Sequence, residues 1–363
     1  MTISLAQSTR SQEIRWSRFP RVANTPEGKQ WLEIQHMLGL ASNTIEAYGR
    51  GLEDFLDWCK HSEVVATAAS RADIAGYVGN LRDRPGHRGK GVVSLDSGGG
   101  LSNATLQQRL TAIRLFFDFL IEQGLRDTNP VGRGRYTPAK GFGARRERGL
   151  LPRYKRLPWI PSDEEWRRFL DRARQEPLRN RLMLALAYDG ALRREELCGI
   201  EAHDVQPAHR LLRIRAETSK SRQDRVVPYS ESSGVLLAAY LSHRRSLSRQ
   251  RGPLFLSESH RNHTEPITLW TWSKVVRRIA DAAGLPRFST HTLRHLCLTD
   301  LARAGWDLHE IARFAGHRNI SATHQYVHLS GRDLSEKLAG GMAQIHEWRA
   351  RQLGQRDFIE EAR

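Results

Sequence analysis

Apolar residues recur every three or four positions along much of the first 130 residues, which is the spacing of one buried helix face. One such stripe follows Ser42 and Asn43, whose side chains are suited to cap the start of a helix. Another follows Ser102 and Asn103 and stops before Gly124, a residue suited to a helix end. The pattern predicts helices over residues 26–38, 42–60, 73–81 and 103–123, which together form a small bundle.

Apolar residues recur at helical spacing again from residue 161 onward, with one interruption. Ser162 and Glu165 form a capping-box pattern at the start of this part. In the interruption, Leu212 and Ile214 alternate with arginines, which predicts a first strand. A polar turn follows, and residues 225–228 are predicted to form a second strand. Further helices are predicted over 179–188, over 193–200 and from 291 onward. The predicted fold class is therefore mainly α, with a small β-hairpin or sheet in the C-terminal domain.

Two segments are too polar and too rich in glycine to build a core. Residues 82–100 contain six glycines and several basic residues, which predicts a loop. Residues 131–160 contain nine Lys or Arg against one Glu, with five glycines and three prolines. This composition predicts a basic linker, which either follows DNA phosphates or is a solvated spacer. The predicted organisation is an N-terminal arm (1–25), a helical domain (26–130), the basic linker (131–160), a second domain (161–333) and a C-terminal helix (334–363).

The charge of the chain points to a polyanionic partner. Lys and Arg number 57 against 40 Asp and Glu, a formal net charge of +17, and nucleic acid is the polyanion we favour. No stretch approaches the roughly 20 apolar residues that span a bilayer, and residues 1–10 lack the apolar run of a signal peptide, so we expect a cytoplasmic protein without a membrane partner. The three cysteines are far apart, which favours reduced thiols over disulfides or a metal site.

The second domain carries residues suited to phosphate chemistry. A guanidinium group offers a planar fork of donors that can hold two phosphate oxygens. Histidine can move a proton near neutral pH, a lysine ammonium can protonate a leaving oxygen, and a tyrosine oxygen can act as a nucleophile. In chain order these residues are Arg193 with Glu196, Lys220 in the polar turn, the run His291-Thr292-Leu293-Arg294-His295, Gly316-His317, and Tyr326.

In this order the set resembles the tyrosine recombinase (phage integrase) family, over most of the chain. The resemblance implies six catalytic residues: Arg193, Lys220, His291, Arg294, His317 and Tyr326. It implies that the two arginines contact the scissile phosphate, that Lys220 reaches the minor groove as general acid, and that Tyr326 forms a 3′-phosphotyrosyl link. Glu196 and His295 have supporting roles. Ala315 replaces the leucine usual before Gly316, a packing position.

The resemblance also implies the wider arrangement. The N-terminal bundle resembles the family's core-binding domain, which forms one half of a clamp around double-stranded DNA. Recombination then requires a homotetramer on two duplexes and a Holliday junction, and residues 334–353 could dock into a neighbouring subunit or fold back on their own. Neither ATP nor a metal is needed, so we expect no cofactor. Residues 1–25 are too few for a further DNA-binding domain. We expect a bacterial or phage protein acting at the nucleoid, for integration or transposition of a mobile element.

Several alternatives stay open at this point. Glu196 could orient its neighbours or form a solvated salt bridge, and the proton of Tyr326 could be lost to a cationic pocket or to a histidine. His291 and His295 have the four-residue spacing of a zinc-binding helix, but Thr292 stands where the glutamate of that motif belongs. For the whole protein, the alternatives are a type IB topoisomerase-like enzyme and a DNA-binding regulator without catalysis. Covalent attachment to DNA separates an enzyme from a regulator, and exchange between duplexes separates a recombinase from a relaxing enzyme.

Overall fold

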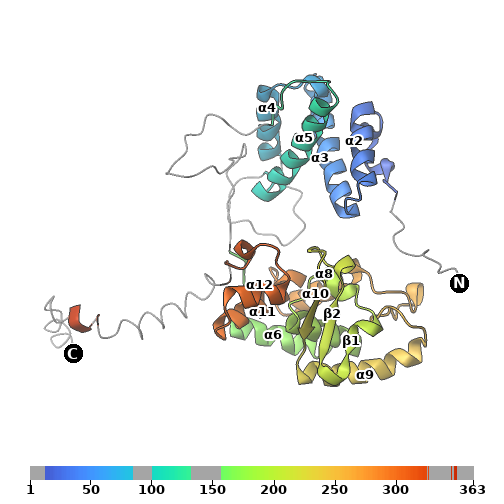
Figure 1. Ribbon diagram of the computed structural model, residues 1–363, viewed down its shortest axis with the longest axis vertical. Helices are drawn as coiled ribbons and strands as arrows, with labels where there is room; N and C mark the ends of the chain where they lie inside the picture. Colours follow the sequence, from blue (N-terminus) through green and yellow to red (C-terminus); the bar gives the residue numbers. More distant parts are fainter. Residues whose placement is uncertain are drawn as a thin grey trace. The chain divides into compact units, whose positions relative to one another are not determined.

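The computed structural model describes residues 13–84, 100–131, 157–324, 326, 345 and 347–349. The chain divides into two compact units, residues 1–155 and 156–363 (Figure 1). Most of the predicted 82–100 loop and 131–160 linker, and nearly all of the predicted C-terminal helix, lie outside the described residues. No helix among the described residues has the length and apolar character needed to cross a bilayer.

The first unit is helical in all its described elements, with α3 packed along α5 (Figure 1). Its aromatic core includes Phe55, whose ring meets Tyr77 edge-on at 5.3 Å and Phe117 at 6.0 Å. The half-buried Asp54 accepts hydrogen bonds from the Tyr77 hydroxyl (2.6 Å) and from Arg84 (2.5 Å), which ties α3 to α4. The elements are η1 (Trp16–Arg18), α1 (Pro20–Ala23), α2 (Pro26–Met37), α3 (Ser42–His61), η2 (Ala66–Ala68), α4 (Arg71–Asp83) and α5 (Asn103–Glu122).

Two predictions about this unit were wrong in detail. Ser42 and Asn43 were predicted to cap the start of helix α3, but both lie inside it, because the helix begins at Ser42 and the Ala41 carbonyl accepts the first backbone hydrogen bonds. Residues 13–25 are not a separate arm. Phe19 is 1% exposed and packs on α3, where a Cβ added at Gly49 would lie 2.8 Å from the Phe19 ring. The N-terminal segment is therefore part of the bundle core.

The second unit is mainly helical with one small sheet, as predicted. Its sheet is antiparallel in the order β1-β2-β3, with Leu212 opposite Val227 in the two longer strands. Strand β1 was not predicted, because two residues show no periodicity. Helix α8 is shorter than predicted and ends at Cys198. The elements are α6 (Asp163–Ala173), α7 (Leu178–Asp189), α8 (Arg194–Cys198), η3 (Ala202–Asp204), β1 (Val205–Gln206), η4 (Pro207–His209), β2 (Leu211–Ile214), η5 (Ala216–Thr218), β3 (Arg225–Pro228), α9 (Glu231–Leu247), η6 (His260–Asn262), α10 (Leu269–Ala282), α11 (Thr290–Arg303), α12 (Leu308–Ala315) and η7 (Ile320–Ala322).

Two apolar clusters hold the second unit together. The larger one joins α6, α7, α9, α10 and the sheet, and the stacked rings of Phe169 and Phe288, 4.0 Å apart, lie within it. The smaller one joins the end of α7 to α11 and α12 and contains Ala191, Leu298 and Tyr326. This smaller cluster fixes the segment that follows α12 against the start of α8. It therefore determines where the predicted site residues meet.

Candidate active site

A buried carboxylate organises the first part of the site. Arg193 is the N-cap of α8, and its backbone N–H and its Nη1 donate to Glu196 at 2.9 and 2.8 Å. Arg225 of β3 donates to both oxygens of the same carboxylate, at 2.9 and 2.7 Å. Burial alone would raise the pKa of Glu196, but the fork of Arg225 and the contacts of Arg193 lower it to about 2. Glu196 is thus a buried orienting anion, and the solvated salt bridge left open above is excluded.

Arg225 is a site residue that the sequence reasoning missed. Its Nε donates to the Phe314 carbonyl at 3.1 Å, so it joins α8 to the end of α12 through one side chain. A signal was present in the sequence. Arg225 lies two residues before the buried Val227, so it occupies a core-facing position of its strand, where a charge needs a partner.

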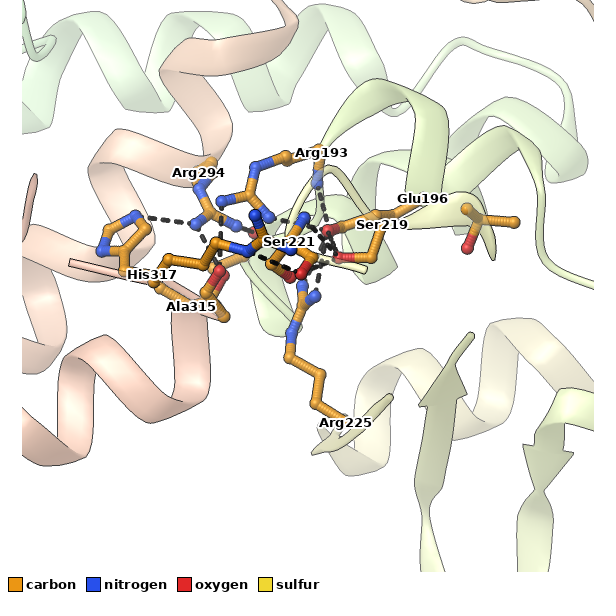
Figure 2. A network of polar contacts seen from close by, with 12 residues as sticks. Arg193, Glu196, Ser219, Ser221, Arg225, Arg294, Ala315 and His317 are labelled. Carbon is orange, nitrogen blue, oxygen red and sulfur yellow. Dashed lines mark hydrogen bonds and ion pairs between the residues drawn. The ribbon is translucent and has the colours of Figure 1, made fainter. Parts of the chain in front are cut away.

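Arg294 supplies the second guanidinium group. It lies on α11, is 4% exposed, and donates to the carbonyls of Ala191 (2.5 Å) and Ala315 (2.7 Å). Its Nη2 also donates to Nε2 of His317 at 2.9 Å. Burial and then the charge of Arg193 lower the pKa of Arg294 to about 10, so it stays cationic at neutral pH. Figure 2 shows Arg193 between Arg294 and Glu196, with His317 and Arg225 at opposite ends of the network.

His317 is positioned by the glycine before it. Gly316 ends α12 with φ +64°, a left-handed conformation, and a Cβ there would lie 3.0 Å from Nη1 of Arg225. The ring of His317 uses both nitrogens, Nε2 with Arg294 and Nδ1 with the Thr323 hydroxyl at 2.8 Å. Burial and then the charge of Arg294 lower the pKa of His317 to about 4. His317 is therefore neutral at physiological pH and carries its hydrogen on Nδ1.

Tyr326 lies beside these residues, 1% exposed. Its ring is nearly parallel to that of His317, with centroids 6.3 Å apart. Its hydroxyl is 2.9 Å from Nδ1 of His295, which lies one residue after Arg294 on α11. His295 was predicted to have only a supporting role, whereas its ring contacts the predicted nucleophile. Burial, and then the charges of His291 and Arg294, lower the pKa of His295 to about 4.

Two predicted residues remain at the edge of this cluster. Lys220 is exposed in the turn between β2 and β3, but the residues on either side of it are buried and anchored. The Ser219 hydroxyl contacts Glu196 at 3.4 Å, and the Ser221 carbonyl accepts from Arg318 at 2.8 Å. His291 is exposed in the first turn of α11. The turn is thus fixed to the site while the Lys220 side chain points to solvent.

The zinc arrangement considered above is not formed by the described residues. The rings of His291 and His295 lie 6.5 Å apart, and His295 contacts Tyr326 through Nδ1. Within the described part of the chain, no three His, Cys, Asp or Glu side chains are grouped to hold a metal ion. An open pocket of about 620 Å³ lies beside the network, and Ser221, Arg225 and His317 are among its lining residues.

The comparisons with known proteins define the class. The model described as "Phage integrase family" matches residues 161–332, and "Phage integrase, N-terminal SAM-like domain" matches residues 29–124. The chain belongs to the tyrosine recombinase (phage integrase) family, as its motifs predicted, and is a site-specific recombinase by family. The tyrosine recombinase XerD of Brucella abortus biovar 1 (strain 9-941) is 30% identical over 326 residues, which cover 85% of this chain and 92% of that protein. The XerD of Oceanobacillus iheyensis is 28% identical over 301 residues, 80% of this chain and 89% of that protein.

Solved structures show the same fold. The XerH site-specific recombinase, bound to palindromic difH substrate in a post-cleavage complex, matches with a TM-score of 0.64 and 20% identity, over 91% of this chain and 90% of that one. The Tn1549 transposon integrase in complex with transposon right end DNA matches with a TM-score of 0.61 and 17% identity, over 85% of this chain and 98% of that one. The predicted fold class, mainly α with a small sheet, is confirmed.

Proposed function

We propose that the enzyme cleaves and rejoins double-stranded DNA through a 3′-phosphotyrosyl intermediate on Tyr326. The observation that carries the proposal is the meeting of Arg193, Arg294, His317 and Tyr326 in one cluster, in which Arg294 and Tyr326 are buried, although the four come from separate segments of the chain. Among the described residues of this network, two guanidinium groups pair with the Glu196 carboxylate and Arg294 adds a third, which leaves two net positive charges. That charge matches the two negative charges of a pentacoordinate phosphorane.

Each residue has a role in this scheme. The Tyr326 oxygen attacks phosphorus as the bond to the 5′ oxygen breaks, and Lys220 gives that oxygen a proton. Arg193 and Arg294 hold the non-bridging phosphate oxygens. Glu196 and Arg225 fix Arg193, and His317 fixes the guanidinium plane of Arg294. The exposed His291 supplies a further donor at the rim. One phosphodiester replaces another of similar energy, so the scheme uses neither ATP nor a metal.

The wider scheme is part of the same proposal. The N-terminal helical unit and the catalytic unit grip the duplex from two sides, and four copies on two duplexes exchange strands through a Holliday junction. The XerH and Tn1549 integrase structures named above contain DNA, which supports a DNA substrate for this chain. The glycine-rich and basic segments 82–100 and 131–160 favour a mobile element as the biological context, with integration or transposition as the task.

A denaturing gel tests the proposal. The protein is incubated in chelator with labelled duplexes from the DNA that flanks its own gene, beside the Tyr326→Phe variant. A protein–DNA adduct that forms only with Tyr326 supports the enzyme. Binding without an adduct, even on nicked substrates that trap the intermediate, supports the regulator instead. Joined products from two different duplexes distinguish a recombinase from a relaxing enzyme.

A further inference from the structure

Three histidines lie near the nucleophile, and their contacts differ. His317 has both ring nitrogens engaged, with Arg294 and with Thr323. His291 is exposed, and its ring lies 6.5 Å from that of His295. Only His295, among these three, has a ring nitrogen in hydrogen-bond contact with the Tyr326 hydroxyl, at 2.9 Å. The geometry therefore separates a histidine that can receive the phenolic proton from two that cannot receive it directly.

We propose that His295 is a catalytic residue that accepts the proton of Tyr326 at Nδ1 during cleavage and returns it during rejoining. This inference rests on the proposed function. In cleavage, the Tyr326 O–H bond breaks as the Tyr326 oxygen bonds to phosphorus, and the proton moves to Nδ1 of His295. The bond from phosphorus to the 5′ oxygen breaks, and that oxygen takes a separate proton from Lys220. In rejoining, a 5′ hydroxyl attacks and His295 protonates the departing Tyr326 oxygen.

The surroundings of His295 couple this proton transfer to DNA binding. Four charged or titratable groups lie around His295. His291 and Arg294 belong to its own helix α11, and His317 and Tyr326 belong to the segment after α12. Burial and then the charges of His291 and Arg294 lower the pKa of His295 to about 4, so its ring is neutral at pH 7. With its hydrogen on Nε2, the ring can accept a proton at Nδ1, the nitrogen that lies 2.9 Å from the Tyr326 hydroxyl. The same cations make it a weak base without substrate. A scissile phosphate held by the arginines brings negative charge, which offsets the cations and raises the basicity of His295.

A purely positioning role for the same contact gives a different expectation. Asparagine places a hydrogen-bonding group close to the position of Nδ1 but does not take up a proton. If His295 only holds the Tyr326 ring in place, His295→Asn retains cleavage and His295→Ala loses it. If His295 is the proton acceptor, both variants lose about 10²-fold or more in cleavage rate, within the usual range for general base catalysis.

The experiment measures single-turnover cleavage of a nicked trapping substrate by wild type, His295→Asn, His295→Ala and Lys220→Ala. Each protein is first checked for folding by thermal melting and for DNA affinity. The substrates carry either the natural 5′ oxygen or a bridging 5′ sulfur at the scissile phosphate. A thiolate leaves without protonation, since thiol pKa values lie near 8.5. The sulfur substrate therefore removes the need for a general acid but not for a base at the nucleophile.

The expected result is that sulfur restores cleavage by Lys220→Ala and leaves His295→Asn slow. The cleavage rate of His295→Asn should also rise with pH between 6 and 9, because solvent must then deprotonate Tyr326, whereas the wild-type rate changes little. Wild-type rates in His295→Asn, or rescue of His295→Asn by the sulfur substrate, overturn the inference and leave the proposed function intact. Absence of an adduct with wild-type protein on either substrate defeats the proposed function itself.

Discussion

Replacing Glu196 by glutamine should destabilise the second unit without changing its shape. The carboxylate is 1% exposed and accepts hydrogen bonds from Arg193 and from both Nη atoms of Arg225. A glutamine presents an NH₂ group to one of those donors, so a buried cation loses its partner. The substitution changes charge and hydrogen bonding at nearly constant volume, which isolates the electrostatic contribution.

The magnitude follows from the pKa. The ordinary value of 4.5 falls to about 2 in the folded protein, and each pKa unit corresponds to 1.36 kcal/mol. The ion-pair cluster therefore contributes on the order of 3 kcal/mol to the free energy of unfolding at pH 7. Because the folded pKa of Glu196 is depressed, this contribution is complete above pH 4.5 and is lost as the pH falls toward 2. The difference between wild type and Glu196→Gln should shrink over the same range.

Urea unfolding of the full chain at pH 7, 5 and 3 measures this difference. Since two units can unfold separately, Asp54→Asn serves as a matched control in the first unit, where Asp54 accepts from Tyr77 and Arg84. Glu196→Gln should lower the free energy of unfolding of the second unit by about 3 kcal/mol at pH 7 and leave the first unit unchanged. Asp54→Asn should affect only the unfolding transition of the first unit. A shift below about 1 kcal/mol at pH 7, or the same shift at pH 7 and pH 3, would refute the reasoning.

Three further predictions concern the site and the substrate. Arg225→Lys should lower the cleavage rate about tenfold or more, measured in single turnover, because an ammonium cannot form the two-pronged contact with Glu196; an unchanged rate would contradict the positioning of Arg193 by this pair. Gly316→Ala should cost about 1–2 kcal/mol in urea unfolding, owing to φ +64° and a Cβ 3.0 Å from Arg225, and equal stability would count against the strained turn. DNA affinity should fall linearly with salt on a log–log plot, measured by fluorescence anisotropy, because Lys and Arg displace counterions; a slope near zero would argue against phosphate contacts.

The sequence predicted those parts of the site that short motifs carry. Arg193, Arg294 and His317 each stand in a local pattern with a defined helix start or turn, and the structure brings them together. Arg225 was missed because its partner Glu196 is 29 residues away and meets it only through tertiary packing of β3 on α8. The contact of His295 with Tyr326 was missed for the same reason, since it spans 31 residues.

The fold was predictable to a similar extent. Long amphipathic helices such as α5, with Ser102 as its cap, follow from periodicity and capping. The packing of residues 13–25 was not predicted, because the segment is short and its apolar residues Ile14, Trp16, Phe19 and Val22 do not follow one sustained helical period. A signal did exist in Gly49, in the middle of α3, which leaves room for the Phe19 ring. Local patterns thus predict elements, whereas close approach between distant segments has to be seen in the structure.

The most direct test of the account is to identify the residue that becomes linked to DNA. Wild-type protein is trapped on a nicked substrate in chelator, digested with nuclease and trypsin, and analysed by tandem mass spectrometry. The account predicts a 3′-phosphonucleotide attached to Tyr326, and no such peptide from Tyr326→Phe. Attachment at another residue, or cleaved DNA without any covalent peptide, would contradict it.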